Sequence, residues 1–231
     1  MIKTFFIGIV LLFLATPLRA GDSNYHQWPQ QQGAEPAKKL IPIPKLVGEV
    51  QVGTGLWLPD GQNFKDFFGN CCTFWNRVQG GVLLQRRYGL EGSVGFVYQS
   101  GSAQGLVNGL PSSDSFKLYF VPTEISAVFR ADYFDWRGLI PFAKVGGDGV
   151  YYRESTDGNV VSGFKYGFHG SGGLQLNLLM VSDSLYESRE EYGIQDAFFK
   201  LEAAYHKINN FGSSSLNLSG VIYSAGFLFY F

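Results

Sequence analysis

From residue 45 onward, hydrophobic and polar residues alternate along the chain with a period of two. Successive side chains of a β-strand point to opposite faces, so this pattern predicts strands with one apolar and one polar face. In the clearest segment, over 164–178, Phe164, Tyr166 and Phe168 share one face, and Lys165 and His169 lie on the other. Seven more segments of this kind are expected, over 47–58, 77–88, 92–101, 116–131, 140–153, 197–207 and 219–231.

The predicted strands are longer than those of an ordinary soluble sheet. Strands of soluble sandwiches average about 5–6 residues, whereas a tilted strand needs about 9–11 residues to cross a bilayer. Membrane barrels also alternate apolar residues outward with polar residues inward. The pattern therefore predicts an all-β fold, an eight-stranded antiparallel transmembrane β-barrel over residues 45–231. A soluble sandwich or a closed secreted barrel is the alternative.

In the predicted strand over 116–131, the apolar residues change from one face to the other. Leu118 and Phe120 occupy the apolar face before Pro122, whereas Ile125 occupies it afterwards. Proline cannot donate a hydrogen bond to a neighbouring strand and is confined to edges or bulges. We therefore expect a β-bulge at Pro122.

The first 44 residues lack this alternation. Lys3 is followed by an uncharged apolar run over 5–15 and by the small residue Ala20 at a suitable cleavage position. This arrangement is typical of a secretory signal peptide, and the run is too short for a transmembrane helix. We assign 1–20 to the signal peptide, 21–44 to a proline- and glutamine-rich periplasmic linker, and 45–231 to the barrel.

Composition narrows the class of protein further. Charged residues make up 16% of the 231 residues, aromatic residues another 16%, and there are 30 glycines. Intrinsic disorder is excluded because disordered chains are poor in aromatic residues and rich in charge. The 18 basic and 19 acidic residues leave no positive surplus for nucleic acid.

The chain ends in an aromatic strand. Its last eight residues, 224–231, resemble the C-terminal assembly signal of bacterial outer-membrane barrels, and the matching positions are Ser224, Gly226, Phe229 and Phe231. The resemblance implies the barrel-assembly machinery and outer-membrane lipid as partners. The chain as a whole is similar to the small eight-stranded OmpA/OmpX/OmpW-like class. The stretches 166–174 and 190–194 are also similar to an uncharacterised family of myxobacterial-type outer-membrane barrels.

Charged residues at inward-facing positions are the main candidates for a polar network in the lumen. An eight-stranded barrel is just wide enough for side chains to fill its interior. The charges are therefore expected to pack against one another, and a charged constriction in a narrow channel is the alternative. The predicted lumen residues are Glu49, Arg77, Arg87, Glu124, Arg130, Lys144, Asp148, Lys165, Lys200 and Glu202.

Two cysteines and a histidine–serine pair are further candidates for chemistry. Adjacent Cys71 and Cys72 are expected to form a strained disulfide after export, with an intermolecular bridge or a redox role as alternatives. His169 and Ser171 loosely resemble the His-x-Ser pair of lipid A deacylases, but Gly172 stands where that family has asparagine. His206 lies on another predicted strand, so the sequence indicates no metal site. No cofactor and no catalytic residue is predicted either.

Outward-facing aromatic residues are expected to form interfacial girdles, together with the tryptophans near strand ends, Trp57, Trp75 and Trp136. The sequence thus predicts a barrel in the outer membrane of a Gram-negative cell. We expect a structural or surface-interaction role without enzymatic activity, with an unidentified surface partner. A narrow, porin-like channel for small or apolar solutes is the alternative, and a lipid A-modifying hydrolase is the third hypothesis.

Overall fold

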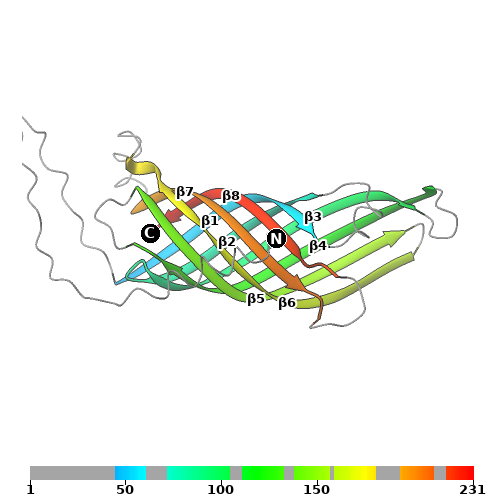
Figure 1. Ribbon diagram of the computed structural model, residues 1–231, viewed down its shortest axis with the longest axis horizontal. Helices are drawn as coiled ribbons and strands as arrows, with labels where there is room; N and C mark the ends of the chain where they lie inside the picture. Colours follow the sequence, from blue (N-terminus) through cyan, green and yellow to red (C-terminus); the bar gives the residue numbers. More distant parts are fainter. Residues whose placement is uncertain are drawn as a thin grey trace, which may run out of the picture. The chain divides into compact units, whose positions relative to one another are not determined.

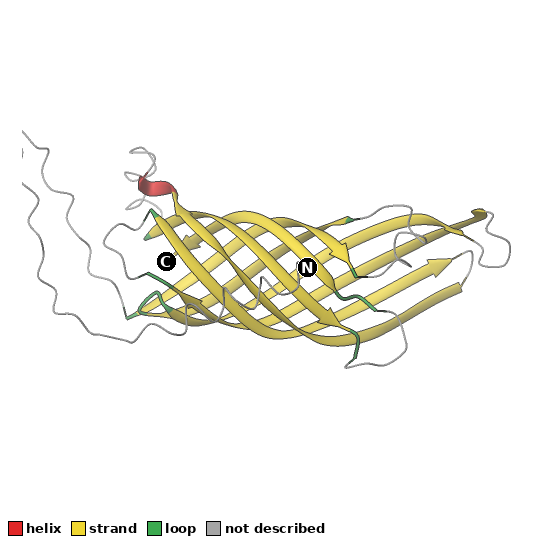
Figure 2. Ribbon diagram, in the orientation of Figure 1, coloured by secondary structure: helices red, strands yellow, loops and turns green. Residues whose placement is uncertain are grey.

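The computed structural model describes residues 45–60, 72–104, 111–132, 138–156, 159–180, 193–210 and 217–231. In this part of the chain, eight antiparallel strands follow one another around a closed barrel, and β8 pairs with β1 (Figures 1 and 2). The prediction of an all-β, eight-stranded antiparallel barrel is confirmed. The strands are β1 (Leu46–Pro59), β2 (Thr73–Leu84), β3 (Tyr88–Gln104), β4 (Pro111–Arg130), β5 (Leu139–Thr156), β6 (Asn159–Asn177), β7 (Asp196–Ile208) and β8 (Gly220–Tyr230).

The described part of the chain contains one short 3₁₀ helix, η1 (Leu178–Met180). None of the described helical residues forms a helix that is long and apolar enough to cross a membrane. The start of β1 and the end of β8 lie side by side at one end of the barrel, where Gly48 and Phe231 exchange backbone hydrogen bonds of 3.2 and 2.9 Å. We call the barrel end at these residues the proximal end, and the opposite end the distal end.

Strands β3 to β6 reach farther than their neighbours at the distal end. β2 pairs with β3 only as far as Phe96, whereas β3 continues to Gln104. On the other side of this group, β7 pairs with β6 only from Gly167 onward, and the residues of β6 that precede Gly167 pair with β5 alone. The four strands therefore form an extension beyond the closed barrel (Figure 1).

The predicted bulge at Pro122 is wrong. The pairing of β4 with β5 is continuous from Phe116 to Arg130. Leu118 and Phe120 point into the lumen, as Glu124 does farther along the strand, and are 1% and 2% exposed. From Phe116 to Arg130 the same set of alternate residues faces the lumen throughout, and it is the polarity of the lumen that changes along the strand. Apolar residues line the lumen at the distal end and polar residues line it at mid-height.

The outer surface of the barrel is apolar at mid-height. Its exposed residues there are mainly β-branched aliphatic ones, as at Val52, Val78, Val94, Ile125 and Val145. Exposed aromatic residues lie toward both ends. They include Tyr88 and Phe231 near the proximal end, and Phe74, Tyr98, Tyr166, Tyr205 and Tyr223 near the distal end. An aliphatic band between two aromatic girdles is the exterior expected of a membrane barrel.

Two clusters of buried apolar residues fill the two ends of the lumen. The proximal cluster comprises Val47, Leu83, Val128, Ile140, Phe198, Leu228 and Tyr230. The distal cluster comprises Trp57, Trp75, Val97, Leu118, Phe120, Val150, Ala204, Ile208, Leu218 and Ile222.

The two tryptophans correct one expectation. Trp57 and Trp75 do not contribute to the girdles, because they are 1% and 5% exposed and lie inside the barrel. Their rings pack edge-on with centroids 6.2 Å apart, and Trp57 also packs edge-on against Phe120 at 5.8 Å. The indoles therefore help to fill the distal end of the lumen.

Candidate functional site in the barrel lumen

Between the two apolar clusters lies a layer of buried polar residues, which we call the charged layer. In the described part of the chain, the buried acidic and basic residues are equal in number, six of each. Burial of unpaired charge is costly, so equal numbers allow every group to find a partner. The acids are Glu49, Glu91, Glu124, Asp148, Asp196 and Glu202, and the bases are Arg77, Arg86, Arg130, Lys144, Lys165 and Lys200. Three of these lie outside the charged layer. Arg86 and Asp196 lie at the proximal end, in the β2–β3 turn and at the start of β7, and Lys165 lies opposite Val150 of the distal apolar cluster.

Arg130 is the centre of the charged layer on the proximal side. Its guanidinium is completely buried and donates to Glu49 at 2.5 Å and to Glu91 at 2.7 Å. It also donates to the hydroxyl of Tyr230, which belongs to the proximal apolar cluster. One cation thus links β4 with β1, β3 and β8 across the lumen. The five N–H donors of arginine suit this multiple pairing.

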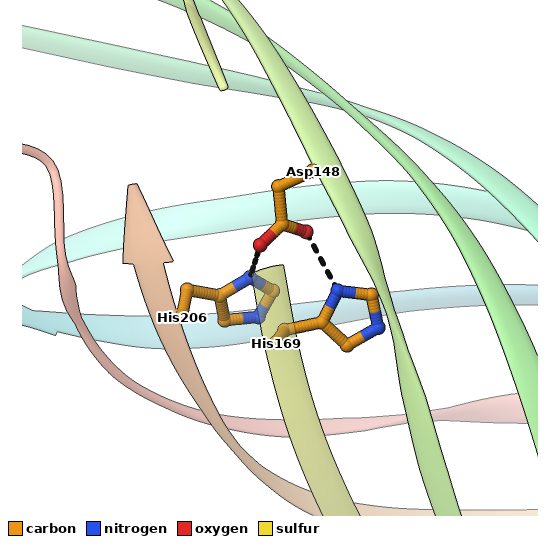
Figure 3. Close-up of side chains that lie close together, drawn as sticks. All are labelled: Asp148, His169 and His206. Atoms are coloured by element: carbon orange, nitrogen blue, oxygen red, sulfur yellow. Dashed lines mark hydrogen bonds and ion pairs between the residues drawn. The ribbon is translucent and has the colours of Figure 1, made fainter. Parts of the chain in front are cut away.

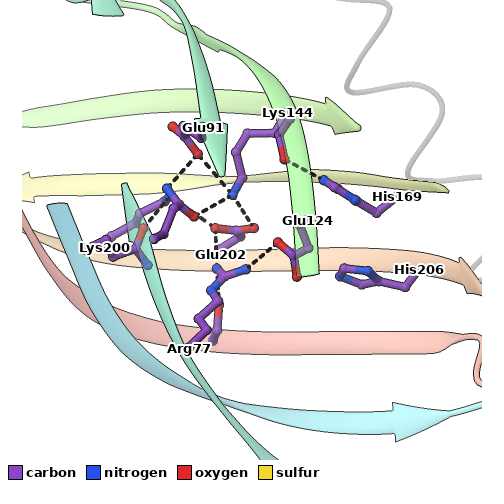
Figure 4. A network of polar contacts seen from close by, with 12 residues as sticks. Arg77, Glu91, Glu124, Lys144, His169, Lys200, Glu202 and His206 are labelled. Carbon is purple, nitrogen blue, oxygen red and sulfur yellow. Dashed lines mark hydrogen bonds and ion pairs between the residues drawn. The ribbon is translucent and has the colours of Figure 1, made fainter. Parts of the chain in front are cut away.

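Glu202 is the corresponding centre at mid-height. Its carboxylate lies 2.7 Å from Arg77, 3.1 Å from Lys144 and 3.2 Å from Lys200 (Figure 4). Arg77 also pairs with Glu124 at 3.5 Å. Because Arg77 is on β2, Lys144 on β5 and Glu202 on β7, these contacts connect three strands across the lumen. A buried network of this kind acts as a polar core.

A separate group of residues lies between Glu202 and the distal apolar cluster. The Asp148 carboxylate accepts from His169 Nδ1 at 2.7 Å and from His206 Nδ1 at 3.2 Å (Figure 3). The two imidazole rings are stacked with centroids 5.0 Å apart. His169 Nε2 lies 2.9 Å from Ser126 Oγ. The ring of His206 packs against Trp75, at 5.5 Å between centroids.

Nine of the ten predicted lumen residues are buried inside the barrel. The exception is Arg87, which lies half-buried in the turn between β2 and β3 and donates to the Asp132 carbonyl at 3.1 Å. This turn contains Gln85 and Arg86, both with positive φ, so β2 ends earlier than predicted. The buried arginine of the turn is Arg86, which pairs with Asp196.

Glu91 was missed by the sequence analysis although it pairs with two cations, Arg130 at 2.7 Å and Lys144 at 3.4 Å. The predicted strand began at residue 92 and so excluded it. Its position has the same parity as the inward-facing Ser93, which is the signal that could have found it. The grouping of His169 with His206 was missed as well, because strand register is needed to see it.

The hypothesis of a His169–Ser171 pair does not match the geometry. Ser171 Oγ is buried and makes no hydrogen bond among the described residues, whereas His169 contacts Ser126 and Asp148. Ser126, His169 and Asp148 are hydrogen-bonded in the same order as the side chains of a hydrolase triad. However, Ser126 is only 3% exposed, beneath the distal cluster, and a nucleophile must touch its substrate.

Other predicted features lie wholly or partly outside the described residues. These are the signal peptide, the linker, Trp136 and Cys71. The disulfide between Cys71 and Cys72 and the place of Trp136 in a girdle therefore stay predictions. Ser224, Gly226 and Phe229 lie on β8, and Phe231 follows it directly. Their role as an assembly signal also stays a prediction.

No protein-family model and no curated protein matches the chain. Solved structures of outer-membrane barrels do resemble it. The outer membrane protein OprG of Pseudomonas aeruginosa matches with a TM-score of 0.53 at 12% identity, over 80% of this chain and 95% of that one. Neisserial surface protein A matches with a TM-score of 0.47 at 14% identity, over 81% and 98%. The N-terminal β-barrel domain of Pseudomonas aeruginosa OprF also has a TM-score of 0.47, at 12% identity, over 80% and 97%.

The chain therefore has the fold of the small eight-stranded outer-membrane β-barrels, as its sequence predicts. The aliphatic band and aromatic girdles of its exterior agree with a location in the bacterial outer membrane. At identities this low, the resemblance carries the fold and no activity.

Proposed function

We propose that this protein is a closed, non-conducting barrel that anchors a surface extension, formed by β3 to β6, in the outer membrane. The observation that carries the proposal is the filling of the lumen. The proximal and distal apolar clusters lie at its two ends, and ion-paired side chains occupy the space between them. Apolar constrictions exclude water and ions from a pore. The alternative of a narrow channel requires a continuous polar path through both clusters.

Reconstitution in a planar bilayer tests the closed lumen. We expect the refolded protein to insert without discrete conductance steps, because each end of the lumen is filled by apolar side chains. Insertion is established separately, by protection from protease and by the different gel mobility of boiled and unboiled samples. Reproducible steps whose ion selectivity changes in Glu124→Lys would contradict the proposal, since they would place Glu124 in an ion path.

Cysteine labelling of intact cells tests the position of the extension. Ser162 is exposed near the start of β6, in the part of that strand that extends beyond β7. In a background with Cys71→Ser and Cys72→Ser, we expect Ser162→Cys to react with a membrane-impermeant maleimide. The matched control is Lys45→Cys at the exposed proximal end, which should react only after the outer membrane is permeabilised. The reverse pattern would place the extension in the periplasm.

A further inference from the structure

We propose that Asp148, His169 and His206 form a binding site for one divalent transition-metal ion of the Zn²⁺ type inside the barrel. This site is distinct from the closed-lumen function proposed above and does not depend on it. Two imidazoles and one carboxylate are a ligand set that zinc uses in proteins, with a fourth position for water. Each residue offers one ligand atom, and these three atoms lie within 4.8 Å of one another.

Strand pairing explains why these residues meet. His169 on β6 lies directly opposite His206 on β7. On the other side of β6, His169 is paired with Gly146 of β5, and Asp148 is the next residue along β5 that points to the same face. Gly146 leaves room for the imidazole, because a Cβ at this position would approach His169 Cε1 to 2.7 Å. The three side chains thus converge from adjacent strands (Figure 3).

The charge around Asp148 favours a cation at this point. Every other buried acid among the described residues has an arginine or lysine within 4.0 Å. In the same part of the chain, the ion-pair partners of Asp148 are the two histidines alone. Glu124 lies opposite Asp148 in the pairing of β4 with β5 and adds a second carboxylate. Arg77 is the cation beside Glu124, at 3.5 Å.

The hydrogen bond between His169 and Ser126 can be kept when a metal binds, whereas metal coordination replaces the two hydrogen bonds to Asp148. The Nδ1 atoms of both imidazoles face Asp148 oxygens, so a metal bound through Nδ1 requires the ring proton of each neutral imidazole to be on Nε2. On His169, the Nε2–H then donates to Ser126 Oγ at 2.9 Å, since a hydroxyl both donates and accepts. Metal-bound histidines commonly donate their second ring nitrogen in this way.

His206 has one hydrogen-bonded ring nitrogen among the described residues, whereas His169 has two. Its Nε2 is buried and has no hydrogen-bond partner among the described residues. Metal coordination at Nδ1 therefore costs this ring no hydrogen bond except the one to Asp148. The ion would link β5, β6 and β7 beneath the distal apolar cluster. Because the site is buried on all sides, we expect loading to accompany folding, as at other structural metal sites.

The test is refolding of the full, untagged chain with and without Zn²⁺, in a Cys71→Ser/Cys72→Ser background that removes thiol ligands. After passage over a chelating resin, we expect about one zinc per folded barrel by elemental analysis. His169→Gln and His206→Gln should each hold less than a tenth of that amount. The matched control is His26→Gln, which changes the one other histidine of the chain and should retain the zinc.

A second measurement does not depend on the folding of the variants. Refolding with Co²⁺ in place of Zn²⁺ should give the visible absorption of a tetrahedral nitrogen- and oxygen-ligated ion. Bound metal should also raise the temperature at which the wild-type barrel loses its folded gel mobility, because a ligand that binds only the folded state stabilises it. A folded wild-type barrel without zinc and without the cobalt spectrum would overturn the proposal. So would zinc that is retained when both His169 and His206 are replaced.

Discussion

Replacement of Arg130 by methionine should destabilise the barrel by about 3–5 kcal/mol, the cost typical of breaking a buried ion pair from one side. The guanidinium is fully buried and pairs with both Glu49 and Glu91. Methionine fills much of the space but leaves two carboxylates close together without this cation. Equilibrium unfolding in urea, followed by tryptophan fluorescence in detergent or lipid, measures the loss.

The control for Arg130 uses an arginine outside the barrel core. Arg153 on β5 is exposed in the extension, and Arg153→Met should change the free energy of unfolding by no more than about 0.5 kcal/mol. Adding Glu49→Gln and Glu91→Gln to Arg130→Met should recover part of the lost stability, because the uncompensated charge is then removed. If Arg130→Met is as stable as the wild type, the charged layer is not the polar core that we describe.

An arginine placed on the outer aliphatic band should have the second large effect. Val78 lies in the middle of β2 and is 52% exposed on the outer face of the barrel, between Val52 and Val94. We expect Val78→Arg to destabilise the protein by about 2–4 kcal/mol in lipid bilayers, because the guanidinium must enter the hydrocarbon. Reversible unfolding from vesicles, in urea or guanidinium chloride, measures this cost.

Val160 provides the matched control, since it is a 55% exposed valine in the part of β6 that extends beyond β7. Val160→Arg should cost less than about 0.5 kcal/mol, as for other exposed surface positions. Equal costs at the two sites would contradict the placement of the hydrocarbon core at mid-barrel. Equal costs measured only in detergent would not contradict this placement, because detergent micelles adapt more readily to a charge.

The charged layer has a consequence for the fold beyond stability. Buried ion pairs are weak evidence for stability, since well-packed apolar residues often do as well. In a membrane barrel, however, the outer face is already apolar. If the lumen were apolar along its whole length, the two faces of each strand would be chemically alike. We infer that the ion pairs of Arg130 and Glu202 help to specify strand register, because a shift of one residue would move these charges to the lipid face.

Much of the barrel could be predicted from the sequence. Alternation with a period of two is a local property, and it defined eight strands and the inward face for nine of the ten predicted lumen residues. Strand ends were less accurate. The turn after β2 depends on positive φ at Gln85 and Arg86, which few residues other than glycine favour. The sequence pattern therefore continued through the turn and assigned Arg87 to the lumen.

Alternation could not decide between two kinds of apolar environment. Leu118 and Phe120 are as apolar as the lipid-facing residues, but they fill the distal end of the lumen. Assigning all these apolar residues to the lipid face required a bulge at Pro122, which the pairing of β4 with β5 does not have. Trp57 and Trp75 were misassigned for the same reason, because both the membrane interface and a packed lumen accept an indole ring.

The strands, the closed barrel class and the inward direction of most charges could be read from the sequence, because they depend on a short-range repeat and on the length of a membrane strand. Which of the inward residues meet depends on the three-dimensional fold. Asp148, His169 and His206 are brought together by the registers of β5, β6 and β7. Register depends on hydrogen bonding between segments that are distant in the chain, so no local pattern carries it.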